Sequence, residues 1–106
     1  MIRAKWEVTE DYKKRCSRLL MENLAPLRAK SGLTQEELAN IAGISRQTYY
    51  VLENGKRELS WCTCMALFFL FDSIDSTAKM MRELKVFPQE MVDQFNAKET
   101  QGGGGA

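Results

Sequence analysis

The chain has 106 residues, of which 44% are hydrophobic, and its 15 Lys and Arg against 14 Asp and Glu leave a net charge of +1. This length supports one domain with a modest core, and no apolar stretch approaches the roughly 18 residues of a membrane span. The chain has no histidine, no glycine-rich phosphate loop, no signal-peptide pattern and no C-x-x-C spacing among its three cysteines, so we expect a cytoplasmic protein that is not an enzyme and needs no metal or other cofactor.

The first helix is expected to follow a flexible N-terminus at residues 1–8. Thr9 can cap this helix, because its hydroxyl can accept a hydrogen bond from a free backbone N–H of the first turn. Over residues 10–22 the apolar side chains recur at helical spacing: Tyr12, Cys16, Leu19 and Leu20.

Pro26 decides how the next segment is interpreted. Inside a continuous helix it would kink the rod and free a carbonyl group. If Asn23 caps a new helix, Pro26 falls in the first turn, where its missing N–H is not needed. We therefore predict separate helices over residues 10–22 and 24–31, with Gly32 ending the second.

Two short helices joined by a tight turn are predicted next. Thr34 and Glu37 have the T-x-x-E spacing of a capping box. Gly43 can end this first helix in a left-handed conformation at little steric cost. A second helix then runs from Ser45 to about Asn54. Two helices joined in this way have the layout of a helix-turn-helix, in which the second helix is free to enter a major groove of DNA.

The C-terminal half predicts three further helices. Ser60 can cap a helix over residues 61–72, which is apolar nearly all round and is expected to lie at the centre of the core. Its aromatic side chains are expected in that core, with a dimer seam as the alternative: Phe68, Phe69 and Phe71. Another helix is expected from residues 75–76, and Pro88 begins a short last one with three inward side chains: Met91, Val92 and Phe95. Residues 98–106 are expected to form a flexible Gly-rich tail.

The second motif helix has an apolar side and a polar side at 100° per residue. Tyr49 and Leu52 fall on the side that can pack on the preceding helix. The outer side chains suit base edges, because Arg matches guanine, Gln matches adenine, and apolar groups match the thymine methyl. We expect base contacts from four residues: Arg46, Gln47, Tyr50 and Val51. Phosphate contacts are expected around both ends of the motif: Thr34, Gln35, Ser45, Asn54, Lys56 and Arg57.

Residues 24–71 resemble the lambda-repressor/Cro-type helix-turn-helix family. The resemblance is carried by five groups of residues in order: Leu27-Arg28, Gly32-Leu33-Thr34-Gln35, Leu38-Ala39, Gly43-Ile44-Ser45-Arg46 and Leu52-Glu53-Asn54-Gly55-Lys56-Arg57. It implies an all-α, five-helix DNA-binding domain, extended here by an N-terminal helix and one or two C-terminal helices. It also implies that Arg28 pairs with Glu53 and that Gln35 holds a phosphate.

Three residues depart from the family pattern. The position of Tyr49 is usually aliphatic and buried, so the phenol hydroxyl must find a partner or reach the surface. The position of Val51 is often polar, which leaves the base preference open. Glu58 lies near the expected phosphate path and would weaken DNA contact there if it faced the duplex.

Charge is distributed unevenly along the chain. Residues 1–57 have eleven Lys or Arg and seven Asp or Glu, whereas residues 58–106 have four and seven, so the basic half contains the motif. Four cations of the first helix are more typical of a solvated face, with an extra DNA arm as the alternative: Lys13, Lys14, Arg15 and Arg18.

Together these features predict one helical domain over residues 9–97, with its helix-turn-helix at 34–54. The expected function is a sequence-specific DNA-binding transcriptional regulator, specifically a repressor. It would bind double-stranded DNA as a homodimer held by the helices after Ser73. No association with a membrane is expected. The alternative is an antitoxin-like or accessory module that binds a protein through residues 68–74 and the C-terminal helices, with DNA binding that is autoregulatory or lost.

Overall fold

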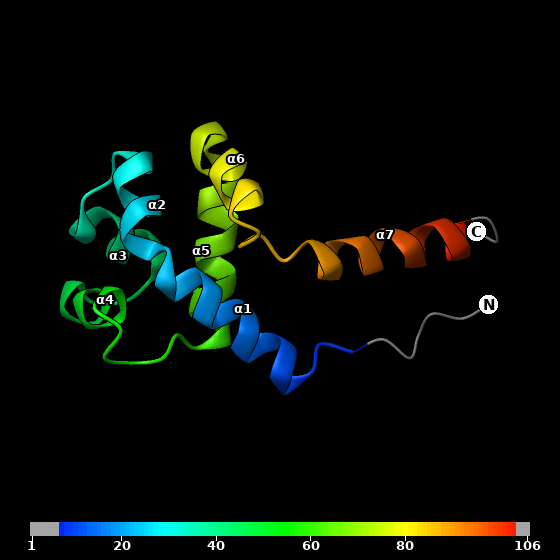
Figure 1. Cartoon of the computed structure of the whole chain (residues 1–106), viewed down its shortest axis with the longest axis horizontal. Coiled ribbons are helices and arrows are strands. Elements are labelled where there is room, and N and C mark those ends of the chain that lie inside the picture. The colour runs from blue at the N-terminus through cyan, green and yellow to red at the C-terminus, as the bar shows by residue number, and fades with distance from the viewer. Residues whose placement is uncertain (1–6, 104–106) are drawn as a thin grey trace.

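The computed structural model describes residues 7–103, with side chains described for residues 7–97, and all regular structure in this part of the chain is helical (Figure 1). The elements in chain order are α1 (Glu10–Glu22), α2 (Leu24–Ser31), α3 (Gln35–Ala42), α4 (Arg46–Glu53), α5 (Trp61–Ser73), α6 (Asp75–Glu83) and α7 (Gln89–Gly103). The all-α class predicted from the sequence is confirmed.

Four helices begin at the hydroxyl caps predicted for them. Thr9 accepts a hydrogen bond from the Tyr12 N–H at 3.1 Å. Ser45 and Ser60 accept the equivalent bonds in α4 and α5. At the start of α3, Thr34 accepts from the Glu37 N–H at 3.0 Å, and the Glu37 carboxylate accepts from the Thr34 N–H at 2.9 Å. These caps fix where each helix starts by satisfying free backbone N–H groups.

Asn23 separates α1 from α2, but its side chain does not cap α2. The backbone at this residue is near-helical (φ −113°, ψ 9°), and the carboxamide instead donates to the Leu19 carbonyl at 2.8 Å. The side chain therefore closes the end of α1. The predicted break and the boundaries of both helices are confirmed, while the predicted side-chain cap is wrong.

The centre of the fold is α5, which packs on α1, α3 and α6 (Figure 1). Leu67 and Phe71 are fully buried, and Phe68 is nearly so. Phe69, in contrast, is 76% exposed. The expectation that all three phenylalanines lie in the core is wrong for this one, because the neighbouring helices cover only one side of α5.

The last helix, α7, extends away from the body of the fold (Figure 1). Its first turn is held against α1, where the buried Met91 donates its N–H to the Tyr12 hydroxyl at 3.3 Å. Phe95 was expected to point inward but is 57% exposed, because no other described helix packs along this part of α7. The helix is also longer than expected and continues to Gly103.

The three cysteines are free thiols. Cys16 and Cys64 are buried and Cys62 is exposed, as expected for two residues two positions apart on one helix. Burial raises the pKa of Cys64 to about 12, so this thiol stays protonated and unreactive at neutral pH. Among the described residues, no cluster of potential ligands could hold a metal ion. No helix in the described part of the chain is both long and apolar enough to cross a bilayer.

Candidate nucleic-acid interface

The turn between α3 and α4 gives α4 its exposed position. Gly43 has φ 77°, and a side chain added there would meet no atom within 4 Å, so the requirement for glycine is conformational. The N–H of Gly43 bonds to the Asn40 carbonyl at 3.2 Å, and that of Ile44 bonds to the Ala39 carbonyl at 3.0 Å. The turn therefore provides hydrogen-bond donors for carbonyl groups at the end of α3 before α4 begins.

Helix α4 buries one side and presents the other to solvent. Tyr49 and Leu52 are buried. The outer face contains the residues for which base contacts were predicted: Arg46, Gln47 and Tyr50 are exposed, and Val51 is half-buried. The guanidinium, carboxamide, phenol and small apolar group therefore lie on one accessible surface of a single helix, as a reader of base edges requires.

The N-terminus of α3 brings several predicted phosphate contacts together. A shallow groove here includes Thr34, Gln35 and Arg46 among its lining residues. The Thr34 hydroxyl accepts the capping bond from Glu37, which leaves its O–H free to donate to an anion. The Ser45 hydroxyl already donates to the Thr48 hydroxyl at 2.8 Å, so it can bind a phosphate only by giving up this bond.

Arg28 and Glu53 join α2 to the end of α4. The Arg28 Nε lies 3.0 Å from Glu53 Oε2, and its Nη2 lies 3.0 Å from Oε1, a bidentate arrangement. The Gln35 amide donates to the same carboxylate at 3.2 Å. Burial alone would raise the pKa of Glu53, but the hydrogen bonds from Arg28 and Gln35 and the Arg28 charge outweigh it, so the pKa is lowered. The bond from Gln35 had no signal in the sequence, because its partner is 18 residues away and is fixed only by the fold.

Tyr49 lies beside this cluster. Its side chain is fully buried, and its hydroxyl has no hydrogen-bond partner among the described residues. Burial is the main reason that the pKa of this phenol is raised, and the negative charge of Glu53 adds to the shift. The hydroxyl therefore neither reaches the surface nor finds a partner, which were the two outcomes expected from the sequence.

Replacing Tyr49 with phenylalanine is expected to leave the free energy of unfolding unchanged or raise it by up to about 1 kcal/mol, because a buried hydroxyl without a partner disfavours folding. The matched control is Tyr12→Phe, which removes a hydroxyl that accepts a hydrogen bond from Met91 and should lower stability by about 1 kcal/mol. Urea denaturation measures both. A loss of stability in Tyr49→Phe as large as in the control would show that the Tyr49 hydroxyl is bonded in solution.

The loop after α4 supplies a second group of cations. Gly55 has φ 74°, and the Lys56 N–H bonds to the Val51 carbonyl at 3.0 Å, which fixes how the chain leaves the helix. Lys56 and Arg57 are exposed, and neither has an ion-pair partner among residues 7–97. Asn54 donates its side-chain amide to the Tyr50 carbonyl at 2.8 Å and so helps to end α4.

The fold and this outer face define a helix-turn-helix protein of the DNA-binding class. A family model described as Helix-turn-helix matches residues 26–60. The chain is also 34% identical over 83 residues to a protein of Bacillus subtilis (strain 168) named "Uncharacterized HTH-type transcriptional regulator YqaE", with 77% of this chain and 72% of the relative covered. No solved structure shows significant similarity to the chain. The chain belongs to the lambda-repressor/Cro-type helix-turn-helix family of DNA-binding transcriptional regulators.

Proposed function

We propose that the protein is a sequence-specific repressor that reads the major groove of its operator with α4 and acts in the cytoplasm. The observation that carries this proposal is the outer face of α4, where Arg46, Gln47 and Tyr50 are all exposed. Occupying an operator is sufficient to exclude other proteins from it, so repression needs no activity beyond binding.

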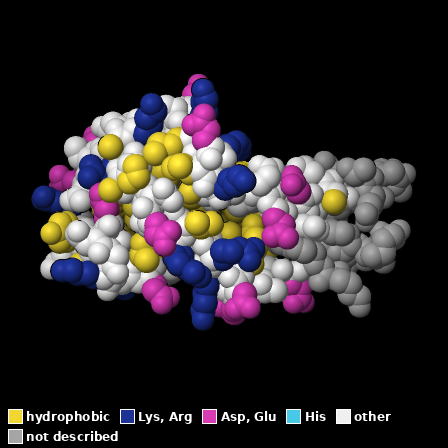
Figure 2. All heavy atoms as spheres, viewed as in Figure 1, with side chains coloured by type: hydrophobic (Ala, Val, Ile, Leu, Met, Phe, Trp, Pro, Cys, Tyr) yellow, Lys and Arg dark blue, Asp and Glu magenta, His cyan; other side chains and the backbone are white. Residues whose placement is uncertain are grey.

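The proposed complex places phosphate contacts on both sides of the base-reading face. Thr34 and Gln35 at the start of α3 would hold one stretch of backbone, and Lys56 and Arg57 after α4 would hold another. Contacts of this kind set the register of a protein on DNA and much of its affinity, whereas the base contacts set the sequence. On the face shown in Figure 2, Lys and Arg lie over the helical body with Asp and Glu interspersed among them. The support from charge is therefore local: Lys56 and Arg57 are both exposed directly after α4.

In vitro selection of duplexes from a random pool, followed by sizing of the complex, tests the proposal. We expect a short consensus and an affinity that falls steeply with salt. Failure to bind any duplex at low ionic strength would refute it. Tight binding without a consensus would limit the function to non-specific DNA association.

We further propose that the protein binds as a homodimer with α5 at the seam. Cys62, Met65 and Phe69 are spaced to share one face of α5, and all three are exposed. Exposed apolar side chains that are contiguous on one helix face mark an interaction surface. This proposal differs from the expectation drawn from the sequence, which was that the helices after Ser73 hold the dimer together.

Replacing Phe69 with lysine is expected to convert a dimer into a folded monomer, because the side chain contributes little to the core of the protomer. Sedimentation equilibrium at micromolar concentration measures the change. The selected wild-type operator should contain two half-sites about 34–36 Å apart, and the variant should lose preference for the paired site. The comparison variant is Phe95→Lys. If this variant dissociates the dimer and Phe69→Lys does not, the seam lies on α7.

The exposed side chains also support a second candidate function. In an antitoxin-like or accessory module, Phe69 and Phe95 would contact a different protein, and DNA binding would be autoregulatory. A wild-type protein that remains monomeric on its operator would favour this alternative over the homodimer.

A further inference from the structure

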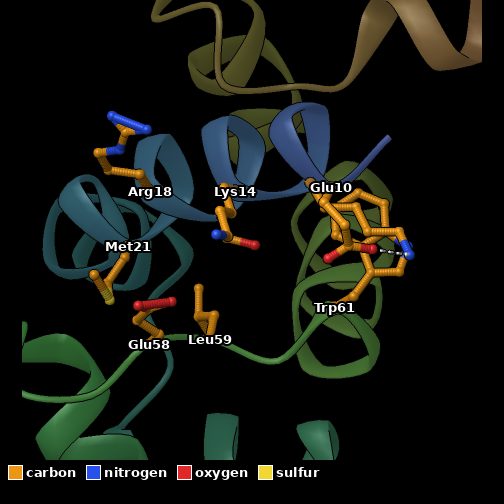
Figure 3. A pocket seen from close by; sticks show the side chains of 9 residues that line it. Glu10, Lys14, Arg18, Met21, Glu58, Leu59 and Trp61 are labelled. Carbon is orange, nitrogen blue, oxygen red and sulfur yellow. Dashed lines mark hydrogen bonds and ion pairs between the residues drawn. The ribbon is translucent and has the colours of Figure 1, made fainter. Parts of the chain in front are cut away.

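A groove separates α1 from the loop between α4 and α5 (Figure 3). Part of its lining is apolar: Met21, Leu59 and Trp61. Another part consists of cations from α1: Lys13, Lys14 and Arg18. Figure 3 shows Glu58 and Leu59 on the loop side, facing α1, and Arg18 projecting outward at the rim. The lining also includes two carboxylates, Glu10 and Glu58, so the groove combines an apolar surface with charged groups among which cations are in excess.

The structure divides the four cations of α1 into two pairs. Lys13 lies 3.4 Å from the Glu10 carboxylate, and Arg15 lies 3.7 Å from that of Glu90 and over the Tyr12 ring. The other pair, Lys14 and Arg18, has no ion-pair partner among residues 7–97. These two residues are four positions apart and so lie on one face of the helix. Two cations that form no ion pair with the described residues therefore border the groove.

The groove is continuous in sequence with the proposed DNA interface. Its loop side begins at Glu58, directly after Lys56 and Arg57, to which we assign phosphate contacts above. The groove therefore begins one residue beyond the proposed phosphate contacts of this loop. Trp61 is half-buried at the same place, so part of its indole remains accessible to a sugar ring.

We propose that this groove receives the sugar–phosphate backbone of the duplex, with Lys14 and Arg18 as phosphate contacts beyond the helix-turn-helix. The inference rests on the proposed DNA-binding function and extends its contact surface to α1. The apolar lining suits deoxyribose, and the cations suit the phosphates on either side of it. Glu58 lies in the same groove, so its carboxylate repels the backbone and weakens the contact.

Salt titration of operator binding tests the inference. Each lost phosphate contact should make the dependence of log K on log salt concentration less steep by about 0.9. We therefore expect Lys14→Gln and Arg18→Gln each to reduce the slope by about this amount for every protomer bound, equally on the selected operator and on an unrelated duplex. Glu58→Gln should have the opposite effect on affinity and bind both duplexes more tightly.

The control variant is Lys79→Gln, which makes the same change in net charge on α6 as each of the single variants Lys14→Gln and Arg18→Gln makes on α1. If Lys14→Gln and Arg18→Gln both have the same salt slope as this control, the inference is overturned and the proposed function stays intact. A wild-type protein that binds no duplex would overturn both. Circular dichroism of each variant, together with its urea midpoint, establishes that changes in binding do not come from unfolding.

Discussion

Replacing Arg28 with alanine is expected to lower the free energy of unfolding by about 3 kcal/mol, because it leaves a buried carboxylate without its cation. The Glu53 side chain is only 7% exposed, whereas that of Arg28 is 26% exposed. Without Arg28, the carboxylate would keep the Gln35 amide as its hydrogen-bond donor, and one neutral amide compensates a buried charge poorly. The loss would appear as a lower urea midpoint with an unchanged denaturant slope.

The reverse variant, Glu53→Ala, is the matched comparison. It removes the buried charge and leaves Arg28, whose guanidinium has access to water. We expect it to cost less than Arg28→Ala, and the double variant to cost less than the sum of the two single variants. If both single variants lose under about 1 kcal/mol, the pair behaves as an exposed surface ion pair, and its role in joining α2 to α4 is wrong.

The same pair predicts how stability depends on pH. The pKa of Glu53 is lowered in the folded state, so its contribution is fully present above the ordinary value of about 4.5 and is lost as the pH falls through the folded-state value. Wild-type stability should therefore decline more steeply than that of Glu53→Gln under acidic conditions. Near neutral pH, this contribution should not vary with pH.

The helix boundaries could be predicted because their causes are local. A hydroxyl three residues before a free N–H, or a glycine able to adopt positive φ, specifies a helix end without reference to the rest of the fold. The Thr34 cap and the Gly43 turn both follow from such short-range rules. Asn23 shows where these rules fail, because a carboxamide can act as a donor as well as an acceptor and here binds the preceding helix.

The burial of individual apolar residues could not be predicted in the same way. Phe68 and Phe69 are adjacent and chemically identical, and only the packing of α1 and α6 on α5 decides which is covered. Phe95 has inward spacing on α7, but no other described helix packs along that part of it. Which side of α4 is exposed could be predicted more easily. Its apolar side has to pack on α3, the helix next to it in the chain, so the polar side must face outward.

The base-reading role of α4 predicts a different outcome for Gln47 than for the phosphate contacts. Gln47→Ala is expected to weaken binding to the selected operator by roughly 10- to 100-fold for each half-site occupied, corresponding to one lost bidentate base contact per protomer, and to leave binding to an unrelated duplex unchanged. Repeating the selection with this variant should relax the consensus at one position per half-site. Competition fluorescence anisotropy at fixed salt measures both affinities.

Lys56→Gln is the comparison that separates base reading from simple attraction. As a phosphate contact, Lys56 should contribute equally on every duplex, so this variant should weaken specific and non-specific binding by the same factor and reduce the salt slope by about 0.9 for every protomer bound. Gln47 carries no charge, and its loss should leave the salt slope unchanged. If Gln47→Ala weakens both duplexes equally, or leaves the operator affinity intact, the outer face of α4 lies on DNA without reading it, and the sequence preference must come from elsewhere on the protein.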